Sequence, residues 1–552
     1  MNVRPCNKLC SLENSTQPLV GAVVVSSTSV SFHLFRANSS DIIKLHRVPI
    51  TNLLSTRDGW LEQDPIAIMR SVEECIDKTM AYEKVTNERV IAIGIANQRG
   101  TVLAWNKNTG VPLSNAILSS DIRTTRMVNE FLRKNDKYKF QNICGLPASS
   151  CFSAFKIKWL IKHDPVVLET CKQGHCYFGT IDTWLIWNLS GGPQAGNFVT
   201  DTTNAAFTFL MDIDKLQWDP TLLKYFGISS DALPKIKSSS EIYGMTNREL
   251  LKVPISSIIG DRQAALLGHK CFRAGDAKAI LGTSGSVIVN TGENKIFSKN
   301  GLLTTIAFHC GPTMRPTYAL EGPISCAGEG IDWVKKNFNT KSNKCDIYPE
   351  KYEKKRKNVY FVPALRGLFA PYWREDARCI IVGFDRNTRS EDIIKAAKES
   401  VCFQIKDIVG ALEKDIKLPI RYLKLNGGVT NDRSLMQFQA DILNVQICVP
   451  TINELTALGA AMMAGNAPGI DAWDIRCMPE IKNDIYAPKM RSDEQEIRYI
   501  DWSRSVVRSF GWVDIPIESK KYDWALTAGI ILASGILIYL FISKKNLTVK
   551  LF

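Results

Sequence analysis

The sequence lacks the paired cysteine motifs that build structural zinc sites. Its 15 cysteines are scattered over 552 residues, and no Cys-x-x-Cys pair meets a second one. Neither His175–Cys176 nor His309–Cys310 has a usual ligand spacing, so these pairs identify no metal ligands. Buried thiols in a reducing compartment are the better interpretation of these cysteines.

The sequence also lacks a secretory signal peptide and a nucleic-acid-binding pattern. Residues 1–18 contain no continuous apolar stretch, which argues against a secretory signal peptide. No basic run alternates with aromatic residues, so nucleic-acid binding is not expected despite a formal net charge of +14. This charge is spread along the chain, and it suits anionic ligands such as nucleotides or an anionic membrane surface.

Low-complexity segments are also missing, and the composition is that of a folded protein. Hydrophobic residues make up 45% of the chain and charged residues 22%. A chain of 552 residues is too long for one core, so we expect two domains of ordinary size.

One segment near the C-terminus is strongly apolar. Residues 524–543 carry no charge, and about twenty helical residues span roughly 30 Å of hydrocarbon. A buried core helix would show a polar stripe, and this segment has none. We therefore expect residues 523–543 to form a transmembrane tail anchor that leaves the bulk of the chain in the cytosol. Flanking lysines favour the mitochondrial outer membrane over the endoplasmic reticulum; they are Lys520, Lys521, Lys544 and Lys545.

The rest of the chain reads as two halves that begin alike. Residues 19–35 predict a strand, a Ser/Thr turn and a second strand, and residues 277–291 repeat that plan with glycines in the turn. Residues 422–430 predict a further strand with a Gly-Gly turn before a helix. This pattern indicates a duplicated α/β fold that holds a nucleotide between its halves.

The second half also predicts a long packing helix and a linker. Ser390 is a candidate helix cap, with Glu391 and Asp392 in the first turn. Its apolar face recurs at helical spacing through Ile394, Ala397, Val401, Ile405, Ile408 and Leu412. Residues 471–522 are polar and weakly periodic, so we expect them to form a linker to the anchor.

Ten long motifs connect the chain to a known family. They are 94–100 (GIANQRG), 145–159 (GLPASSCFSAFKIKW), 179–187 (GTIDTWLIW), 199–206 (VTDTTNAA), 253–268 (VPISSIIGDRQAALLG), 301–307 (GLLTTIA), 318–322 (YALEG), 360–373 (YFVPALRGLFAPYW), 435–443 (LMQFQADIL) and 456–465 (TALGAAMMAG). From about residue 19 to 469 the chain resembles the FGGY family of sugar and polyol kinases, and within it glycerol kinase most closely.

The resemblance implies an α/β fold of two actin-like (ribonuclease H-like) lobes with the active cleft between them. After an extension, 1–18, residues 19–270 would form the substrate lobe and residues 271–470 the nucleotide lobe. The family transfers a phosphoryl group from ATP, with Mg²⁺, to a terminal hydroxyl, mainly by positioning the groups and neutralising charge. The implied ligands are therefore ATP, Mg²⁺ and glycerol or another polyol, while self-association of the chain is left open.

The resemblance also assigns roles to individual residues. Asp261 matches the general base, and Arg99 matches the arginine that grips substrate hydroxyls. Arg262 and Cys151 fall at further substrate-binding positions. The positions implied for the nucleotide are Ser27 and Thr28 in the first hairpin, Thr283 and Ser284 in the second, Gly427 and Gly428 in the later turn, and Asp432 near the adenine.

The chain departs from the family pattern at the chemistry. Val24 stands where the family has an acidic residue that helps hold the metal, and valine cannot bind Mg²⁺. Ser31 stands where an arginine is expected. On the substrate side, Gly100 replaces a glutamate. The other replacements are Cys151 for a tyrosine, Arg262 for a glutamine, Ser119 for a tryptophan, Ser286 for a phenylalanine and Asn426 for an aspartate.

Three functions are compatible with this pattern. The first is ATP-dependent phosphorylation of glycerol to glycerol 3-phosphate, favoured by Asp261 and the overall similarity. The second is a kinase for another polyol, favoured by the altered substrate wall. The third is a weak or inactive relative that serves as a membrane-tethered nucleotide-binding or scaffold protein, favoured by Val24. Of these, the sequence favours the glycerol kinase.

Overall fold

The computed structural model describes residues 17–51, 53–54, 57, 59–82, 89–247, 251–338, 358–475 and 481–513. The chain divides into two compact units, Met1–Phe510 and Gly511–Phe552, and the helices and strands described below all belong to the first. The expected anchor at 523–543 lies outside the described residues. Within the described ranges, no helix combines the length and the apolarity needed to cross a bilayer.

The N-terminal lobe is built on a six-stranded sheet. Its strands lie in the order β14-β15-β6-β1-β2-β3. Strands β1, β2 and β3 pair antiparallel, as do β14 and β15, whereas β1, β6 and β15 run parallel to one another. The bounds are β1 Leu19–Val25, β2 Ser29–Arg36, β3 Ile42–Pro49, β6 Val90–Asn97, β15 Pro254–Gly260 and β14 Ser240–Met245.

The C-terminal lobe repeats this pairing in a seven-stranded sheet of order β18-β19-β17-β16-β22-β23-β24. Strands β16, β17 and β19 form the antiparallel part, and β16, β22 and β23 run parallel. The predicted duplication is therefore confirmed in the order of the hairpin and of the parallel strands beside it, while β18 has no counterpart in the first sheet. The bounds are β16 Ala277–Leu281, β17 Gly285–Gly292, β18 Leu303–Phe308, β19 Thr317–Ile324, β22 Tyr422–Asn426, β23 Gln446–Pro450 and β24 Asn483–Tyr486.

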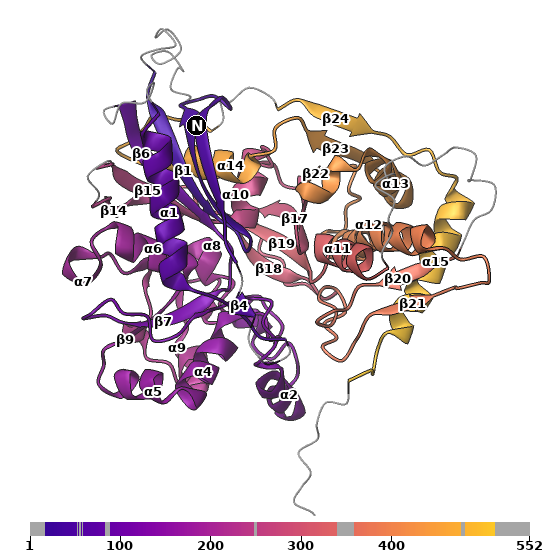
Figure 1. Ribbon diagram of the computed structural model, residues 1–552, viewed down its shortest axis with the longest axis horizontal. Coiled ribbons are helices and arrows are strands. Elements are labelled where there is room, and N and C mark those ends of the chain that lie inside the picture. Colours follow the sequence, from indigo (N-terminus) through magenta and orange to yellow (C-terminus); the bar gives the residue numbers. More distant parts are fainter. Residues whose placement is uncertain are drawn as a thin grey trace, which may run out of the picture. The chain divides into compact units, whose positions relative to one another are not determined.

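One helix from late in the sequence packs against the N-terminal sheet. Helix α14 (Leu455–Asn466) contacts β1, β6, β15 and α10 (Asp261–Gly268), and Figure 1 shows it in orange among the indigo strands. The approach is close because glycines line it: a Cβ on Gly459 would lie 1.9 Å from the Ala264 carbonyl oxygen, and one on Gly94 would lie 2.4 Å from that of Ala460. The predicted boundary at residue 270 therefore divides the sequence into two halves, but α14 of the second half packs on the N-terminal lobe.

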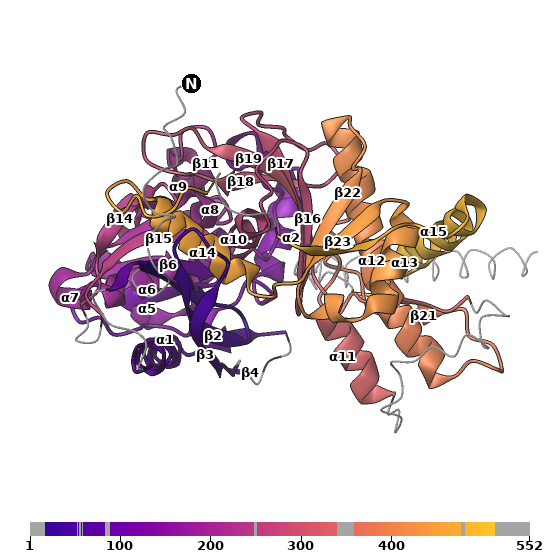
Figure 2. The same cartoon turned by 90° about the horizontal axis from the view of Figure 1, so that it is seen from above.

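Helices of the C-terminal lobe are drawn together in Figure 2. They are α11 Gly328–Asn337, α12 Ser390–Ile416, α13 Arg433–Leu443 and α15 Ser492–Arg508. The predicted apolar face of α12 is buried throughout. The helix begins at Ser390 and is not capped by it; instead the Asp392 carboxylate accepts a hydrogen bond of 2.8 Å from the Arg389 backbone N–H.

The prediction of a linker over 471–522 is wrong for its central part. Strand β24 pairs with β23, and α15 packs on the lobe through Asp407 of α12. The two carboxylate oxygens of Asp407 accept hydrogen bonds of 2.8 Å from the Tyr499 hydroxyl and the Trp502 indole N–H. These partners lie far from Asp407 in the sequence, so local polarity alone gave no sign of the contact.

The N-terminal lobe carries the remaining elements, apart from one hairpin. A second sheet runs in the order β4-β5-β8-β7-β9. Its strands are β4 Leu53–Leu54, β5 Leu61–Gln63, β7 Val102–Asn106, β8 Ala116–Ile117 and β9 Cys176–Thr180. The helices are α1 Pro65–Met80, α2 Thr125–Lys134, α3 Gln141–Cys144, α4 Ser153–His163, α5 Pro165–Lys172, α6 Ile181–Leu189, α7 Gly192–Ala195, α8 Thr202–Ala205 and α9 Pro220–Phe226.

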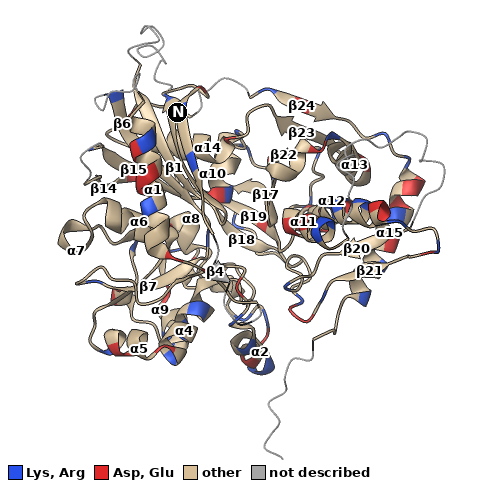
Figure 3. Cartoon of the chain, in the orientation of Figure 1, with Lys and Arg blue, Asp and Glu red and all other residues tan. Residues whose placement is uncertain are grey.

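Short strands and turns complete the fold. Strand β10 (Val199–Asp201) pairs with β13 (Lys235–Lys237), and β11 (Met211–Asp212) pairs with β12 (Gln217–Trp218). In the C-terminal lobe β20 (Tyr360–Val362) pairs with β21 (Ile380–Val382). Basic and acidic residues are interspersed along the outer helices, as Figure 3 shows on α1, α12 and α15, in line with the dispersed charge of the sequence.

Candidate active site

Strand register brings the first hairpin, Arg99 and Asp261 to one edge of the N-terminal sheet. Val25, at the end of β1, is the register partner of Asn97 at the end of β6. Gly260, at the end of β15, is also a partner of Asn97. Because these strands are parallel, the residues that follow them meet at the same sheet edge, which is where α/β proteins place their ligands.

Asp261 begins helix α10 directly after that edge. Its Oδ1 accepts a hydrogen bond of 2.8 Å from the Arg262 backbone N–H. Burial raises the pKa of Asp261, and the neighbouring Arg262 and Arg99 guanidinium groups oppose this without cancelling it. A carboxylate with a raised pKa holds a transferred proton better than an exposed one.

Arg99, the arginine predicted to bind substrate hydroxyls, is buried and tightly packed in the structure. The Arg99 guanidinium lies 4.4 Å from the centre of the Phe207 ring. A Cβ on Gly260 would lie 2.5 Å from Arg99 Cδ, so glycine at this position lets the arginine lie against the turn. Gly100 has φ +72°, and a Cβ there would lie 2.9 Å from Phe207. The local backbone therefore disfavours the glutamate that the family pattern expects.

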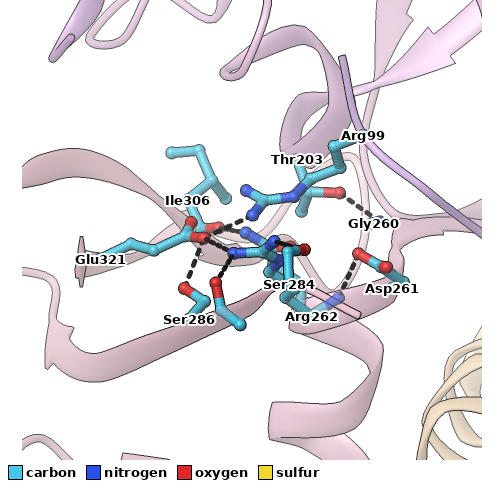
Figure 4. Close-up of polar contacts among 11 residues, drawn as sticks. Arg99, Thr203, Gly260, Asp261, Arg262, Ser284, Ser286, Ile306 and Glu321 are labelled. Carbon is cyan, nitrogen blue, oxygen red and sulfur yellow. Dashed lines mark hydrogen bonds and ion pairs between the residues drawn. The ribbon is translucent and has the colours of Figure 1, made fainter. Parts of the chain in front are cut away.

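Figure 4 shows Arg99 and Arg262 of the N-terminal lobe converging on Glu321 of the C-terminal lobe. Glu321, on β19, accepts at its Oε1 from Arg99 Nη2 at 2.6 Å and from Arg262 Nη1 at 3.3 Å. The Ser286 hydroxyl donates to the same oxygen at 2.8 Å. Burial on its own would raise the pKa of Glu321, but the two arginines outweigh it and hold the pKa below its ordinary value. Glu321 is therefore an ionised carboxylate.

Glu321 is the site residue that sequence reasoning missed. The YALEG motif contains it, but the motif was used only for family resemblance and carried no role for its glutamate. Arg99 and Arg262 lie more than fifty residues before it in the chain, and only the folded lobes bring the three together. The glutamate in the YALEG motif was the only signal in the sequence, and its arginine partners could not be identified without the folded structure.

Arg262 extends from the substrate side to the second hairpin. Besides Glu321, its guanidinium donates to the Gly285 carbonyl at 2.8 Å and to the Ser284 hydroxyl at 3.3 Å. It thus connects the general-base candidate to the turn predicted to hold phosphates. Ser286, at a position where the family pattern has phenylalanine, is buried, and its hydroxyl donates a hydrogen bond to Glu321.

Cys151 lies next to the Arg99 loop but within the apolar core. A Cβ at Gly100 would lie 3.2 Å from the Cys151 carbonyl oxygen. Burial raises the pKa of the Cys151 thiol to about 12, so the thiol is neutral at physiological pH. Its backbone N–H donates to the Ser149 hydroxyl at 3.4 Å. A substrate contact of this thiol stays a prediction.

The second hairpin and the Gly-Gly turn meet at one edge of the C-terminal sheet. Ile280 of β16 is the register partner of Asn426 at the end of β22. Thr283, in the turn of this hairpin, is exposed. Its backbone carbonyl accepts a hydrogen bond of 3.0 Å from the N–H of Ala327, the residue just before α11. A Cβ on Gly428 would meet nothing within 4 Å, so a ligand can approach this backbone closely.

Two of the residues predicted to bind the nucleotide, Gly427 and Asp432, also have structural roles. Gly427 has φ +112°, and a Cβ there would lie 2.2 Å from the Leu281 carbonyl oxygen, so packing against β16 already requires glycine. Asp432 caps α13 by accepting from the Leu435 N–H at 3.1 Å, and it also binds Lys398 Nζ at 2.8 Å. Burial tends to raise the pKa of Asp432, but these hydrogen bonds lower it overall.

The first hairpin is closed on itself by serines. The Ser26 hydroxyl donates to the Ser29 carbonyl at 3.0 Å and accepts from the Thr28 and Ser29 N–H groups at 3.2 and 3.0 Å. The Ser27 carbonyl accepts from the Gln63 side chain at 2.8 Å. Thr28 is exposed, so its hydroxyl is accessible as the resemblance requires.

Val24 and Ser31 are register partners in this hairpin and carry no charge. Val24 packs against the apolar cluster around α14. The Ser31 hydroxyl pairs with His33 Nε2 at 2.9 Å. Among the described residues, no group of three or more His, Cys, Asp or Glu side chains is placed to hold a metal ion. The first hairpin, residues 19–35, therefore contributes no carboxylate of its own to a Mg²⁺ site.

Comparison with known proteins gives a consistent result over most of the chain. The N-terminal domain of the FGGY family of carbohydrate kinases matches residues 22–268, and its C-terminal domain matches residues 277–467. A glycerol kinase of Clavibacter michiganensis is 40% identical over 467 residues, which cover 84% of this chain and 92% of the relative. A glycerol kinase of Brucella anthropi is 37% identical over 505 residues, 90% of this chain and 99% of the relative.

Solved structures agree with the fold. The crystal structure of Plasmodium falciparum glycerol kinase with ADP matches with a TM-score of 0.78 at 34% identity, covering 89% of this chain and 98% of that one. A ligand-bound xylulose kinase from Lactobacillus acidophilus matches with a TM-score of 0.75 at 21% identity, over 90% of this chain and 99% of the other. At that identity the second match speaks only for the shared fold.

Proposed function

The chain belongs to the FGGY family of carbohydrate kinases, and on that premise we propose that it transfers the γ-phosphoryl group of ATP to a terminal hydroxyl of glycerol, giving glycerol 3-phosphate. The observation that carries the proposal is the convergence of Asp261 and Arg99 at one sheet edge, beside a hairpin of the other lobe. The glycerol kinases that share 37–40% identity with the chain support glycerol as the acceptor.

Asp261 acts as the general base. Its carboxylate takes the proton of the attacking hydroxyl while that oxygen approaches the γ-phosphorus in line. Burial, which raises the pKa of Asp261, brings its basicity closer to that needed at neutral pH. Arg99 holds the neighbouring hydroxyls, so that the reacting one is positioned before transfer begins.

The second hairpin and the Gly-Gly turn fit the nucleotide. The exposed Thr283 hydroxyl, the Ser284 hydroxyl and the open backbone at Gly428 would contact the phosphates, and ATP supplies the phosphoryl group that is transferred. Arg262 donates to Ser284 and so lies next to these groups, where its charge can stabilise the phosphoryl oxygens. Ser27, Thr28 and Asp432 complete the proposed contacts.

The residues present do not build a site for Mg²⁺ at the first hairpin. Val24 has no donor atom, and its half-buried side chain packs against an apolar cluster. Mg²⁺ commonly retains waters and is held by one or two carboxylates together with substrate phosphates. We therefore propose that Mg²⁺ enters with ATP and is held mainly by the phosphates, and we assign no step to a metal fixed by Val24 or its neighbours.

A second function is favoured by Val24, which stands in place of the expected metal-site carboxylate. A chain that has lost a metal-site carboxylate could bind nucleotide without turnover and act as a scaffold. Purified full-length protein in detergent, assayed with ATP, Mg²⁺ and glycerol, separates the two. Glycerol-dependent ADP formation that disappears in Asp261→Asn supports the kinase. Bound ATP without glycerol-dependent turnover in folded protein would favour the scaffold.

We also propose that residues 523–543 anchor the protein to the mitochondrial outer membrane, with residues 1–510 in the cytosol. The apolar stretch 524–543, which carries no charge, and its flanking lysines support this proposal. Expression of the full chain and of a chain ending at Lys521 tests it. The full chain should sediment with mitochondria and the shorter one should remain in the supernatant; equal sedimentation of both would contradict the anchor.

A further inference from the structure

We infer that Glu321 binds the substrate directly: one carboxylate oxygen holds Arg99 and Arg262, and the other accepts a hydrogen bond from a hydroxyl of a neutral polyol. This inference rests on the proposed kinase function and adds a specificity-determining residue to it. The residue lies on β19 of the C-terminal lobe, opposite the lobe that carries Arg99 and Asp261.

The two oxygens of Glu321 have unequal surroundings. Oε1 accepts from Arg99 Nη2, Arg262 Nη1 and the Ser286 hydroxyl at 2.6, 3.3 and 2.8 Å. Oε2 is buried, and none of the described residues donates a hydrogen bond to it. A buried acceptor without a partner destabilises a protein markedly, and an ionised one more so. The carboxylate is thus fully held on one side and unsatisfied on the other.

Arg99 shows the complementary pattern. Its Nη2 is bound to Glu321, while Nε and Nη1 are buried and, within the described part of the chain, unpaired. Unsatisfied donors and an unsatisfied acceptor therefore belong to the same ion pair. A hydroxyl group can donate to Oε2 and accept from the guanidinium at once, and a diol offers two such groups. A carboxylate or phosphate would satisfy Arg99 only.

Charge excludes an anionic substrate on separate grounds. Arg99 and Arg262 carry two positive charges, and Asp261 and Glu321 carry two negative ones, so the cluster is already neutral. An anion would lie beside Glu321 and Asp261, and burying an unpaired charge is strongly unfavourable. The acceptor position beside Arg99 and Glu321 is therefore matched to a neutral ligand.

Glu321 also accounts for the missing glutamate at position 100. Gly100 has φ +72° and lies against Phe207, so a larger side chain there would be strained and crowded. The carboxylate that the substrate hydroxyls need comes instead from the other lobe, at 2.6 Å from Arg99. Substrate contacts from both lobes would make glycerol binding dependent on the lobes being together.

Binding calorimetry on full-length protein in detergent tests the inference. The ligands are the neutral polyols glycerol, erythritol and xylitol, and glycerate as the anionic counterpart of glycerol. Glu321→Gln alone would leave two arginines facing one carboxylate, and Arg262→Gln alone would leave two carboxylates facing one arginine. The charge-balanced Arg262→Gln/Glu321→Gln is therefore compared with the wild-type protein, which is also balanced, and with Arg262→Gln to separate the contribution of the arginine. The amide nitrogen puts a donor where Oε2 accepts. Thermal unfolding of each variant verifies that it is folded.

The double variant should bind glycerol roughly 10- to 100-fold more weakly than Arg262→Gln, as expected for loss of a hydrogen bond to a charged group. Equal affinities, or tighter binding of glycerate than glycerol by the wild-type protein, would overturn the inference. If another neutral polyol binds and needs Glu321 while glycerol does not bind, the inference stands and glycerol as substrate falls. If no neutral polyol binds the folded wild-type protein, both are overturned.

Discussion

The two lobes begin with the same strand–turn–strand unit, and the two turns differ in their side chains. In the first turn, Ser26 closes the loop on itself, and Val24 in the strand before it packs, half-buried, against an apolar cluster. In the second, Thr283 is exposed and Ser284 accepts from Arg262. The strand pairing is equivalent in both. A duplicated backbone therefore supplies two equivalent platforms, and only the side chains decide which of them carries charge toward the ligands.

The strongest test of this contrast is removal of the proposed general base, Asp261, which lies at the sheet edge of the first hairpin and next to Arg262, the residue that contacts the second hairpin. Asp261→Asn should lower kcat for glycerol by about 10²- to 10⁴-fold, because an amide cannot take the hydroxyl proton. Steady-state assays with glycerol and ATP measure this. Glycerol affinity should change far less than kcat. Unchanged turnover in the variant would remove Asp261 from the chemistry.

A carboxylate restored to the first hairpin should make the two turns more alike in function. Val24→Asp should lower the Mg²⁺ concentration that gives half-maximal turnover by roughly tenfold, as expected for one added charged ligand. Val24→Asn, of similar size without the charge, is the matched control. Equal Mg²⁺ dependence in the aspartate and asparagine variants would contradict a role for charge at this position.

Hydroxyl removal at the two turns compares them directly. Thr283→Val should raise the KM for ATP by about five- to tenfold, since one phosphate hydrogen bond is lost. Thr28→Val should raise it less, because the first turn lacks the neighbouring arginine that the second has through Ser284. Each valine keeps the shape of the side chain. A larger effect at Thr28 than at Thr283 would reverse the assignment of the second hairpin as the main phosphate contact.

The strands before the two turns differ as well. Three residues before the end of β1 is Ala22, and three before the end of β16 is Lys278; both are fully buried. Lys278 Nζ lies 2.8 Å from His269 Nδ1, and His269 Nε2 lies 2.8 Å from Asn483 Oδ1. Burial lowers the pKa of Lys278 to about 7 and, together with Lys278, lowers that of His269 to about 2. The imidazole is neutral, so its Nδ1 accepts from the ammonium.

This lysine predicts a pH dependence of stability with a definite sign. The folded pKa of about 7 lies below the model-peptide value of 10.5, so between these values the unfolded chain binds the additional proton. Stability should rise as pH increases through this window, by at most about 1.4 kcal/mol per pH unit from this group. Lys278→Met should flatten the slope in denaturant unfolding measured from pH 7 to 10. An equal slope in the variant would exclude Lys278 as its cause.

Local patterns predicted the elements whose interactions are mostly near in sequence. The hairpins at 19–35 and 277–291 and the apolar face of α12 depend on alternation or helical spacing within a few turns, and the structure confirms them. The linker prediction failed because α15 is stabilised by Asp407, some ninety residues away in the chain. A polar helix that packs on a distant carboxylate has no strong local signal.

The sequence by itself determined the family and the paired lobes, and it predicted Asp261 and Arg99 as site residues, because long motifs and strand–turn chemistry are written in consecutive residues. Only the tertiary structure decided that Glu321 joins Arg99 and Arg262, and that α14 packs on the lobe opposite to its place in the chain. It also gave the reason for Gly100, whose backbone and contact with Phe207 leave no room for a glutamate. Ion pairs and close helix contacts depend on distances between remote segments, which are set when the lobes pack and which no local pattern encodes.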